Sequence, residues 1–469
     1  MNIRKSKIIC TIGPATGSRE MIYALIKNGM DVARLNFSHG DHGFHRKIIN
    51  LIREESKKLK KPVAILQDLQ GIKIRVGLIA GGSVDLKRGT EIFLHGGKEI
   101  SSDKHIFISY PALRKDAKIG DRILFDDGLI QALVIDKTKG ALKVKIIEGG
   151  ILKDKKGVNL PHTKTTLSSF TEKDRNDLEF GLKMGVDYVA LSFVRRSGDV
   201  RIVKEWLRER HKTLPLIAKI EKPEALNNID EILNEVEGIM VARGDLGVEV
   251  SPEEVPMLQK MLIEKANKKG RLVITATQML ESMTEHMRPT RAEAADVANA
   301  VIDGTDALML SAETTIGKYP REAVIMMDHI IRRTEEQRYT TSQYIKGESF
   351  SEAVADAATK AAEDIEAKYI AAFTQSGFTA KLLSKFRPNI PIVAFTHSED
   401  IKRRMSLYWG VTPEIIRPLK STDAVFNKVE KALIKNGMAK PGDSIVITAS
   451  TPILGAGKTN LMKLHTIGK

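Results

Sequence analysis

The chain has 469 residues, of which 42% are hydrophobic and 28% are charged, so it is long enough for roughly two to four domains and unlike a disordered protein. Its single cysteine, Cys10, excludes an intramolecular disulfide, and no apolar run reaches the ~18 residues of a membrane span. We therefore expect a soluble cytoplasmic protein.

The net charge of +15 raises the hypothesis of a nucleic-acid-binding protein. Aromatic residues make up only 5% of the chain, and it has neither zinc-finger spacing nor an aromatic-rich basic patch. The alternative is that the cations are scattered over solvated surfaces and gathered at a site for an anionic substrate. We favour this alternative and expect no nucleic-acid or membrane partner.

Eight short runs rich in Val, Ile and Leu, each ending in polar residues, alternate with helix-like segments. Parallel strands that are buried on both faces have such continuous apolar runs. The pattern predicts a (β/α)8 TIM barrel formed by residues 1–72 and 169–338. The runs are 7–12, 32–37, 63–69, 188–194, 216–221, 239–246, 272–278 and 307–312.

Two of the expected barrel helices carry start signals. Ser169 with Glu172, and Thr290 with Glu293, have the spacing of a capping box. Gly185 is a stop signal for the first of these helices.

A long segment between the third and fourth runs has short alternating stretches divided by Gly and Asp turns, which is typical of a small all-β module. We expect this module to be a lid formed by residues 73–168. Because it is inserted after a barrel strand, it should lie over the carboxyl face, where barrel sites form. Its runs are 73–79, 83–89, 90–97, 105–110, 121–128, 129–135 and 141–150.

After the eighth run, a polar segment (332–351) marks a boundary, and helix-like and apolar segments then alternate again. Predicted helices 351–365 and 379–386 precede strands 369–374 and 390–396. A further helix, 423–437, precedes strand 444–450, and 461–468 closes the chain. Residues 339–469 therefore form a separate C-terminal α/β open-sheet domain, within the usual size range.

Polar residues follow several of the predicted barrel strands and should converge on one face. They are Arg34, Asn36, Ser38 and His39 after the second strand, Asp68 and Arg75 after the third, Lys219 and Glu221 after the fifth, Arg243 and Asp245 after the sixth, and Thr277 and Gln278 after the seventh.

Four of these residues together suit phosphoryl transfer. Lys219 and Glu221 are two positions apart, so in a strand they share one face, and a buried pair of charges needs partners. Glu221 and Asp245 suit one hard divalent cation such as Mg²⁺. Arg34 and Lys219 suit a phosphate and a developing oxyanion. Each residue taken alone also has a purely structural explanation: Arg34 could form a surface salt bridge, and Asp245 could belong to a turn.

A series of motifs runs in order along nearly the whole chain: CTIGPAT, ARLNFSHG, KGVNLP, AKIEKPEAL, GIMVARGDLGVE, TATQMLESM, RPTRAEAADVANAV and LMLSAETTIGKYP. In these motifs the chain resembles the pyruvate kinase family, and the combination of MVARGDLG, TQMLESM and RPTRAE is highly specific. The resemblance implies the last step of glycolysis, in which phosphoenolpyruvate gives its phosphoryl group to ADP, yielding pyruvate and ATP.

The resemblance also implies roles for the substrate residues. Arg34 clamps the transferring phosphoryl group, Lys219 faces the bridging oxygen, and Thr277 lies beside the methylene face, where the enolate is protonated. The backbone amides of Gly244 and Asp245 receive the substrate carboxylate. Arg34, Lys219 and Thr277 are thus the expected catalytic residues.

Two cation sites are implied as well. Glu221 and Asp245 hold Mg²⁺ or Mn²⁺. The family's monovalent-cation site matches the side chains of Asn36, Ser38 and Asp68 and the carbonyl of Leu69. The expected nucleotide-binding residues are Asn36, His39, Arg75, Lys156, Asn159 and Asp127, the last of which would come down from the lid.

Lys73 departs from the commonest family pattern, DTKGPEIR, which here reads DLQGIKIR. A glutamate at this position goes with K⁺ dependence in the family, and a lysine with K⁺ independence. The ammonium and K⁺ carry the same charge, so Lys73 can supply it permanently. We expect activity without K⁺. The alternative is an ordinary solvated lysine.

A second site is predicted in TQSGFTAK, where Thr374, Ser376, Gly377 and Thr379 follow a strand and open a helix. Backbone N–H groups there bind anions, although an ordinary Ser/Gly cap has the same sequence. The resemblance implies that this loop receives a phosphorylated allosteric effector, and that the enzyme is a homotetramer.

A different barrel enzyme of phosphoenolpyruvate or pyruvate, an aldolase-type lyase, is the alternative function. It could share the carboxylate pair that binds Mg²⁺. It would lack the lid lysine Lys156 and would need no nucleotide.

Overall fold

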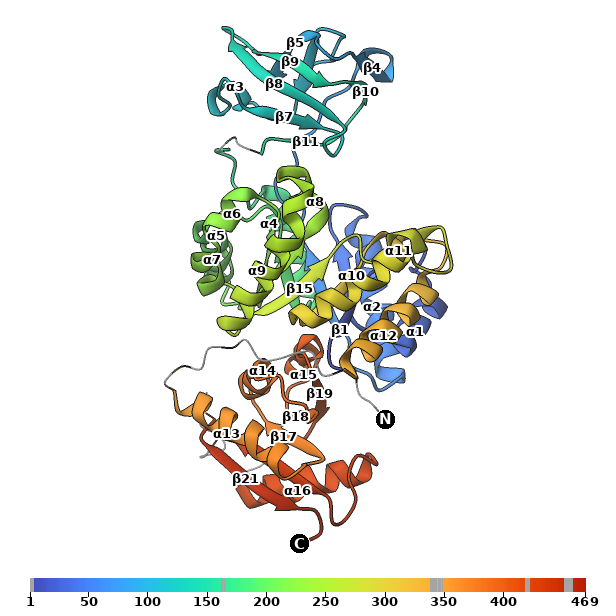
Figure 1. Ribbon diagram of the computed structural model, residues 1–469, viewed down its shortest axis with the longest axis vertical. Helices are drawn as coiled ribbons and strands as arrows, with labels where there is room; N and C mark the ends of the chain where they lie inside the picture. Colours follow the sequence, from blue (N-terminus) through green and yellow to red (C-terminus); the bar gives the residue numbers. More distant parts are fainter. Residues whose placement is uncertain are drawn as a thin grey trace.

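The computed structural model describes residues 4–161, 163, 165–337, 344, 347, 349–417, 422–450 and 459–469. Three parts follow one another along the long axis of the molecule, with the lid at the top of Figure 1, the barrel in the middle and the C-terminal domain at the bottom. The predicted boundary at residue 338 lies outside the described residues.

The predicted barrel is confirmed. Its strands close in the order β1-β16-β15-β14-β13-β12-β3-β2, and every neighbouring pair is parallel. The strands are β1 (Lys7–Thr11), β2 (Met30–Asn36), β3 (Ala64–Asp68), β12 (Tyr188–Leu191), β13 (Leu216–Ile220), β14 (Gly238–Ala242), β15 (Leu272–Ala276) and β16 (Ala307–Leu310).

Helices surround the barrel (Figure 1). The longer ones are α1 (Arg19–Asn28), α2 (His42–Lys58), α4 (Glu172–Met184), α5 (Ser197–Glu209), α7 (Ile229–Glu235), α9 (Val255–Lys268), α10 (Arg291–Asp303) and α12 (Pro320–Glu335). Short helices are α6 (Pro223–Asn227), α8 (Arg243–Glu249), α11 (Ala312–Thr315), η2 (Pro252–Glu254) and η3 (Glu281–Thr284).

The capping predictions met different outcomes. The box of Thr290 and Glu293 is present at α10, and Gly185 ends α4 in the left-handed conformation. The box predicted from Ser169 is wrong, because α4 is capped two residues later by Thr171 and Asp174. The two overlapping patterns in SSFTEKD have the same spacing, and the structure uses the second.

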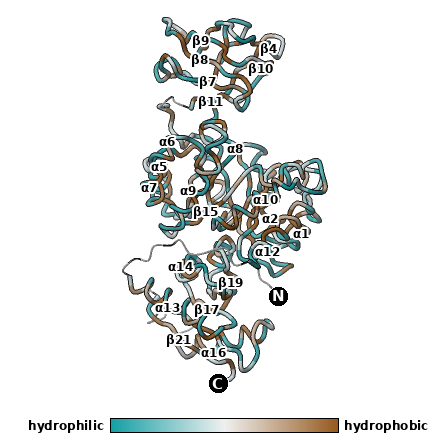
Figure 2. The backbone as a smooth tube through the Cα atoms, in the orientation of Figure 1, coloured by the Kyte–Doolittle hydropathy of each residue, from teal (hydrophilic) through white to brown (hydrophobic). Residues whose placement is uncertain are grey.

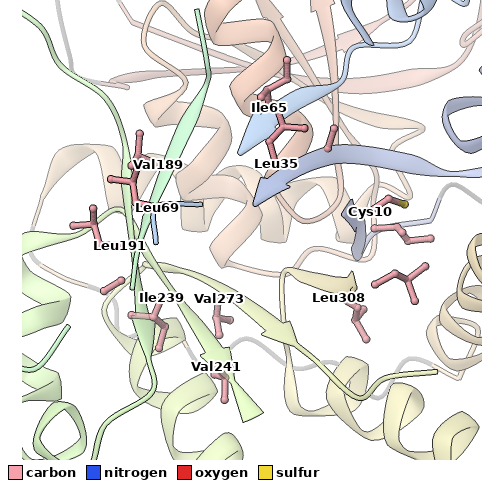
Figure 3. Close-up of a cluster of buried hydrophobic side chains, with 14 of the residues drawn as sticks. Cys10, Leu35, Ile65, Leu69, Val189, Leu191, Ile239, Val241, Val273 and Leu308 are labelled. Atoms are coloured by element: carbon pink, nitrogen blue, oxygen red, sulfur yellow. The ribbon is translucent and has the colours of Figure 1, made fainter. Parts of the chain in front are cut away.

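Two layers of apolar side chains hold the barrel together. Ile9, Leu66 and Met240 belong to the set that fills its interior. The other set faces the surrounding helices, and Figure 3 shows members of it on different barrel strands, such as Ile65 on β3 and Val273 on β15. Burying each such side chain stabilises the fold by ~1.5–3 kcal/mol, which explains the continuous apolar runs in the sequence.

The sixth predicted strand, 239–246, is wrong at its end. The strand β14 stops at Ala242, and residues 243–249 form helix α8. Arg243 and Asp245, polar residues that follow Ala242, open this helix rather than forming the polar end of the strand. Asp245 consequently lies in the first turn of a helix.

The lid forms a six-stranded sheet of order β11-β7-β8-β9-β5-β6 and a two-stranded sheet of β10 and β4. The predicted first run, 73–79, is wrong as a strand, since it makes only isolated bridges such as Arg75 to Gly157. The elements are η1 (Ala80–Gly82), β4 (Ser83–Leu86), β5 (Glu91–Gly96), β6 (His105–Ile108), α3 (Leu113–Asp116), β7 (Arg122–Phe125), β8 (Ile130–Lys137), β9 (Leu142–Glu148), β10 (Gly150–Lys153) and β11 (Val158–Asn159).

The C-terminal domain is the predicted open sheet, of order β19-β18-β17-β20-β21, in which only β21 is antiparallel to its neighbour. Its elements are α13 (Phe350–Asp364), β17 (Tyr369–Phe373), α14 (Phe378–Lys385), β18 (Ile392–Thr396), α15 (Glu399–Arg404), η4 (Met405–Leu407), β19 (Val411–Ile415), α16 (Thr422–Lys435), β20 (Ser444–Ala449) and β21 (Leu461–Thr466).

This domain packs against the amino ends of the barrel strands. The ammonium of Lys7 donates to the carbonyl of Val411 at 2.8 Å, and the hydroxyl of Tyr188 donates to the carbonyl of Arg404 at 2.8 Å. Lys7 and Tyr188 are the first residues of their strands. The lid is inserted after the carboxyl end of β3, so the two additional domains lie at opposite ends of the barrel.

Hydrophobic stretches occur in all three parts of the chain (Figure 2). Within the described ranges, no helix combines the length and the apolar character that crossing a bilayer requires.

Candidate active site

Buried charges gather at the carboxyl ends of β2, β3 and β13. The ammonium of Lys219 lies 2.7 Å from Oε1 of Glu221 and 3.4 Å from Oδ1 of Asp68, and it donates to Oγ of Ser192 at 2.9 Å. The Lys219–Glu221 contact is an ion pair that is not aligned as a hydrogen bond. Nε of Arg34 donates to the other oxygen of Asp68 at 2.7 Å. The barrel therefore brings these predicted residues together.

The carboxylates of this cluster are not equally neutralised. Burial disfavours the charge of Asp68, but Lys219 and Arg34 outweigh it and lower its pKa. Burial raises the pKa of Glu221 to about 7, and the charge of Asp245 adds to the shift while Lys219 opposes it. Burial lowers the pKa of Lys219, but the surrounding carboxylates outweigh this effect and raise it overall. Lys219 therefore remains charged, and Glu221 lacks a full counter-charge.

Unusual backbone conformations shape the strand ends around the cluster. Phe193, Thr277 and Gln278 all have positive φ, at 56°, 65° and 53°. Non-glycine residues rarely adopt this region, and such strain is concentrated at functional sites. At Phe193 the turn aims the backbone N–H at Oε2 of Glu221, which accepts it at 2.7 Å.

The first turn of α8 meets the turn after β15. The amide of Gly244 donates to Oγ1 of Thr277 at 2.8 Å. The guanidinium of Arg243 donates to the carbonyl of Thr277 at 2.7 Å and lies 2.7 Å from Asp296. Arg243 therefore fixes the turn that carries Thr277 and points away from the cluster. Gly244, Asp245 and Thr277 are brought together as predicted.

A cavity of about 110 Å³ lies between the lid and the barrel. Its lining includes Lys73, Asp127, Asn159, Lys222 and Asp245. Burial and a neighbouring arginine lower the pKa of Lys73, while Asp245 and Asp127 act in the opposite direction. The lid thus carries Asp127 and Asn159 to the side of the cavity facing Asp245.

The remaining residues predicted to bind nucleotide lie at the same end. Burial lowers the pKa of His39 most, and the positive charges of Lys73, Arg75 and Arg34 lower it further, in that order. These three cations therefore lie near the imidazole. Arg75 donates to the carbonyl of Lys155 at 2.9 Å. Lys156 forms an ion pair with Asp126 at 2.8 Å.

The predicted monovalent-cation ligands lie at neighbouring strand ends, where Asn36 pairs with Asp68. Their oxygens already have partners, because Oδ1 of Asn36 accepts the amide of Ser38 at 3.1 Å and the carbonyl of Leu69 accepts Oγ of Ser192 at 2.7 Å. Lys73 forms no ion pair within 4 Å in the described part of the chain. The carboxylates that act on it are those of Asp245 and Asp127.

The predicted effector residues separate into different environments. Thr374 is buried and accepts the amide of Gly377 at 3.0 Å. Thr379 contacts Thr459 through their hydroxyls at 2.7 Å. Ser376 lines a different hollow, of about 320 Å³, between the C-terminal domain and the barrel. Residues 451–458, which precede Thr459, lie outside the described residues.

The donor chemistry of the carboxyl end fits a divalent cation. Within the described ranges, no group of three or more His, Cys, Asp or Glu is arranged to hold a metal on its own. Mg²⁺ does not need one, because it usually keeps several waters and takes one or two carboxylates. Glu221 and Asp245 supply this pair. Burial, together with the charge of Asp245, raises the pKa of Glu221, and a bound cation would stabilise the charged carboxylate.

Sequence reasoning missed three contributors, Ser192, the amide of Phe193 and the clamp by Arg243. Ser192 lies in the predicted fourth run directly after β12 and was a detectable strand-end polar residue. The other two depend on backbone turns that no residue pattern announces.

The comparisons with known proteins agree along the chain. The family model "Pyruvate kinase, barrel domain" matches residues 3–324, and "Pyruvate kinase, alpha/beta domain" matches residues 352–465. The chain is 46% identical over 473 residues to pyruvate kinases of Geobacillus stearothermophilus and Staphylococcus aureus strain MRSA252, covering 99% of this chain and 80% and 81% of theirs. A crystal structure of a Cryptosporidium parvum pyruvate kinase matches with a TM-score of 0.94 at 36% identity, covering 99% of this chain and 96% of that one.

Proposed function

The chain belongs to the pyruvate kinase family, and from this premise we propose that the charged cluster at the carboxyl end of its barrel is the catalytic centre. The reaction transfers the phosphoryl group of phosphoenolpyruvate to ADP and yields pyruvate and ATP. The observation that carries the proposal is Lys219, a buried ammonium held between Glu221 and Asp68 beside Arg34.

Lys219 and Arg34 provide the positive charge that this chemistry needs. Phosphoryl transfer proceeds with charge on the transferring oxygens and needs positioning more than covalent catalysis. We assign Arg34 to the phosphoryl group and Lys219 to the bridging oxygen, which carries charge as the enolate leaves. The raised pKa of Lys219 keeps its ammonium charged throughout.

Thr277 and the first turn of α8 receive the rest of the substrate. The amide of Gly244 now donates to Oγ1 of Thr277, and a bound carboxylate would replace that acceptor. The hydroxyl of Thr277 is then released beside the methylene carbon, where the enolate takes up its proton. Arg243 holds the turn in place during this exchange.

Pyruvate kinases use Mg²⁺, and we assign its protein ligands here to Glu221 and Asp245. A bound cation would supply positive charge to the carboxylate and enolate oxygens of the substrate. Each carboxylate would contribute oxygens while waters and substrate complete the coordination.

We assign the nucleotide to the lid side of the site. The candidates are those predicted from the sequence: the cations Arg75 and Lys156, the imidazole of His39, the amides of Asn36 and Asn159, and the carboxylate of Asp127. Lys156 is paired with Asp126 in this structure and would exchange that partner for a phosphate.

We also propose that activity does not require K⁺, because Lys73 supplies a fixed positive charge. Its support is the position of Lys73 in the cavity wall with Asp245 and Asp127. The test compares turnover in KCl with turnover in a matched tetramethylammonium salt. Equal rates are expected, and a large stimulation by KCl would refute the idea.

The effector site and the homotetramer predicted from the resemblance remain proposals. We assign the hydroxyl of Ser376 to the phosphorylated ligand, because the hydroxyl of Thr374 is used within the loop and that of Thr379 contacts Thr459. A Ser376→Asp variant that responds to every phosphorylated effector as the original enzyme does would contradict this assignment.

A coupled assay of ATP formed from phosphoenolpyruvate and ADP tests the function directly. The account expects ATP in stoichiometric amounts with pyruvate, and only when a divalent cation is present. Cleavage or formation of a carbon–carbon bond with no need for ADP would instead identify the aldolase-type lyase.

A further inference from the structure

Glu249 is a buried carboxylate at the end of α8 that the catalytic assignments above leave without a role. Its side chain is 1% exposed. Oε1 accepts the side-chain amide of Asn159 at 2.7 Å and lies 2.5 Å from the ammonium of Lys222. Its other oxygen, Oε2, is buried with no hydrogen-bond partner.

The bond between Asn159 and Glu249 joins the lid to the barrel. Asn159 belongs to β11 of the lid sheet, whereas Glu249 and Lys222 belong to the barrel. In the part of the chain that the structure describes, it is the one hydrogen bond between a strand of the lid and the barrel. The other hydrogen bonds between lid and barrel involve the linker that leads from β11 back to the barrel. There, Arg195 donates to the carbonyl of Thr165 at 2.7 Å.

This contact adjoins the cavity between the lid and the barrel, which Asn159 lines and Glu249 does not. Glu249 follows Asp245 by four positions on α8, so the two side chains lie one helical turn apart on the same face. Asn159, Lys222 and Asp245 line the same cavity of about 110 Å³, together with Lys73 and Asp127. The hydrogen bond at Asn159 therefore keeps the lid in place, and with it the position of Asp127 in the same cavity as Asp245.

We propose that Glu249 is a positioning residue, a latch that holds the lid closed over the catalytic site. Lys222 neutralises the carboxylate while it is shielded from water, since a buried charge is costly unless it is paired. When the lid lifts, water can replace the Asn159 amide, so the contact favours closure without locking it. The inference rests on the proposed placement of nucleotide-binding groups on the lid.

The loss of a hydrogen bond to a charged group predicts the size of the effect. Such bonds are typically worth enough to shift an equilibrium roughly 10–100-fold. Removing the side chain of Glu249 should therefore shift the ratio of open to closed lid by about tenfold or more. A glutamine retains an oxygen that can accept the Asn159 amide, so Glu249→Gln should keep more of the closed form than Glu249→Ala.

Double electron–electron resonance on the full chain measures this ratio. Lys139 of the lid and Glu205 of the barrel are exposed, and cysteines there carry the spin labels. Cys10 is buried and burial raises the pKa of its thiol, so it will not compete for label. With ADP present, the background protein should give one narrow distance. Glu249→Ala should add a longer, broader population, and Glu253→Ala, at an exposed position nearby, should not.

Identical distance distributions for Glu249→Ala and the background protein would overturn the proposal. If Glu249→Ala fails to fold, Asn159→Leu removes the same bond from the lid side, and the same two outcomes apply to it. A KM for ADP that rises in Glu249→Gln less than in Glu249→Ala would agree with a latch. An enzyme with no ATP-forming activity would contradict the proposed function but leave the distance measurement valid.

Discussion

Two clusters of buried charge lie at opposite ends of the barrel, and they differ in how their charges are held. At the carboxyl ends, Asp68 and Glu221 form ion pairs with Lys219 and Arg34, and Asp245 acts on both Lys219 and Lys73.

At the amino ends, Asp306 lies 2.5 Å from Lys385 and 2.9 Å from Arg387, so cations outnumber carboxylates. This second cluster is completed by neutral acceptors. Oδ1 of Asn267 accepts from both cations at 3.2 Å, and the carbonyl of Gly304 accepts from Arg387 at 2.8 Å.

The comparison shows that burial of charge does not by itself identify a functional site. The amino-end cluster joins the barrel to the C-terminal domain, and neutral groups of the protein, Asn267 and the carbonyl of Gly304, accept from its cations. At the carboxyl end, burial raises the pKa of Glu221 to about 7, and the cluster lies beside a cavity. A buried carboxylate whose charge is disfavoured, next to a cavity that can admit a cation, distinguishes the carboxyl end.

Lys219→Met should give the largest effect, because it removes the cation at the centre of the carboxyl-end cluster. We expect kcat to fall by at least about 10³-fold, the upper range for loss of one preorganised charge donor. The coupled ATP assay measures this, with circular dichroism to confirm folding. Lys385→Met, at the other end, is the matched control and should retain most of its turnover. Near-normal turnover of Lys219→Met would refute the assigned role.

Asp306→Asn should have the opposite effect to Lys219→Met: a loss of stability with little change in kcat. It leaves two buried cations without a carboxylate, and breaking a buried ion pair in this way typically costs about 3 kcal/mol or more. Urea denaturation followed by circular dichroism should show the loss of stability, while kcat of the folded enzyme changes little. An unchanged midpoint, or a large loss of kcat, would mean that the two clusters do not differ as described.

Lys73→Glu should convert the enzyme to K⁺ dependence. The substitution replaces a cation with an anion beside Asp245 and Asp127, and a single charge at ~4 Å is worth about 1–4 kcal/mol. We expect KCl to stimulate the variant about tenfold over a tetramethylammonium salt and the original enzyme hardly at all. Equal salt responses of the two proteins would contradict the role of Lys73.

The smallest expected effect is a pH dependence of stability at the amino end. Burial lowers the pKa of Lys385 from 10.5 to about 7. Between these values the unfolded chain binds a proton that the folded protein does not, so stability rises with pH above 7 and falls as pH drops toward 7. Relative to Lys385→Met, the slope should be at most about 1.4 kcal/mol per pH unit. If the free energy of unfolding changed with pH in the same way in the original protein and in Lys385→Met, the prediction would be contradicted.

The barrel and the C-terminal domain were predictable because their strands are continuous runs rich in Val, Ile and Leu that parallel sheets must bury. The lid was predictable from short alternating runs divided by Gly and Asp turns. Errors occurred where a helix begins directly after a strand, as at α8, and where an alternating run forms only isolated bridges, as at residues 73–79. The strand β19 carries Pro413 and was not predicted, because proline argues against a strand.

The candidate site was predictable where side chains lie at the carboxyl ends of strands, as for Arg34, Asp68 and Lys219. The helix position of Asp245, the direction of Arg243 away from the cluster and the latch at Glu249 were not predicted. These depend on how turns and domains meet in three dimensions, and no local pattern of residue types records that.

Binding of Mn²⁺, followed by electron paramagnetic resonance, tests the central claim most directly. The account predicts one site that weakens by about tenfold or more in Asp245→Asn, because a direct ligand should matter at least as much as the outer contacts that usually cost 10–100-fold. Asp306→Asn, which alters the other cluster, should bind Mn²⁺ as the original protein does. Equal affinity in the original protein and Asp245→Asn would contradict the account.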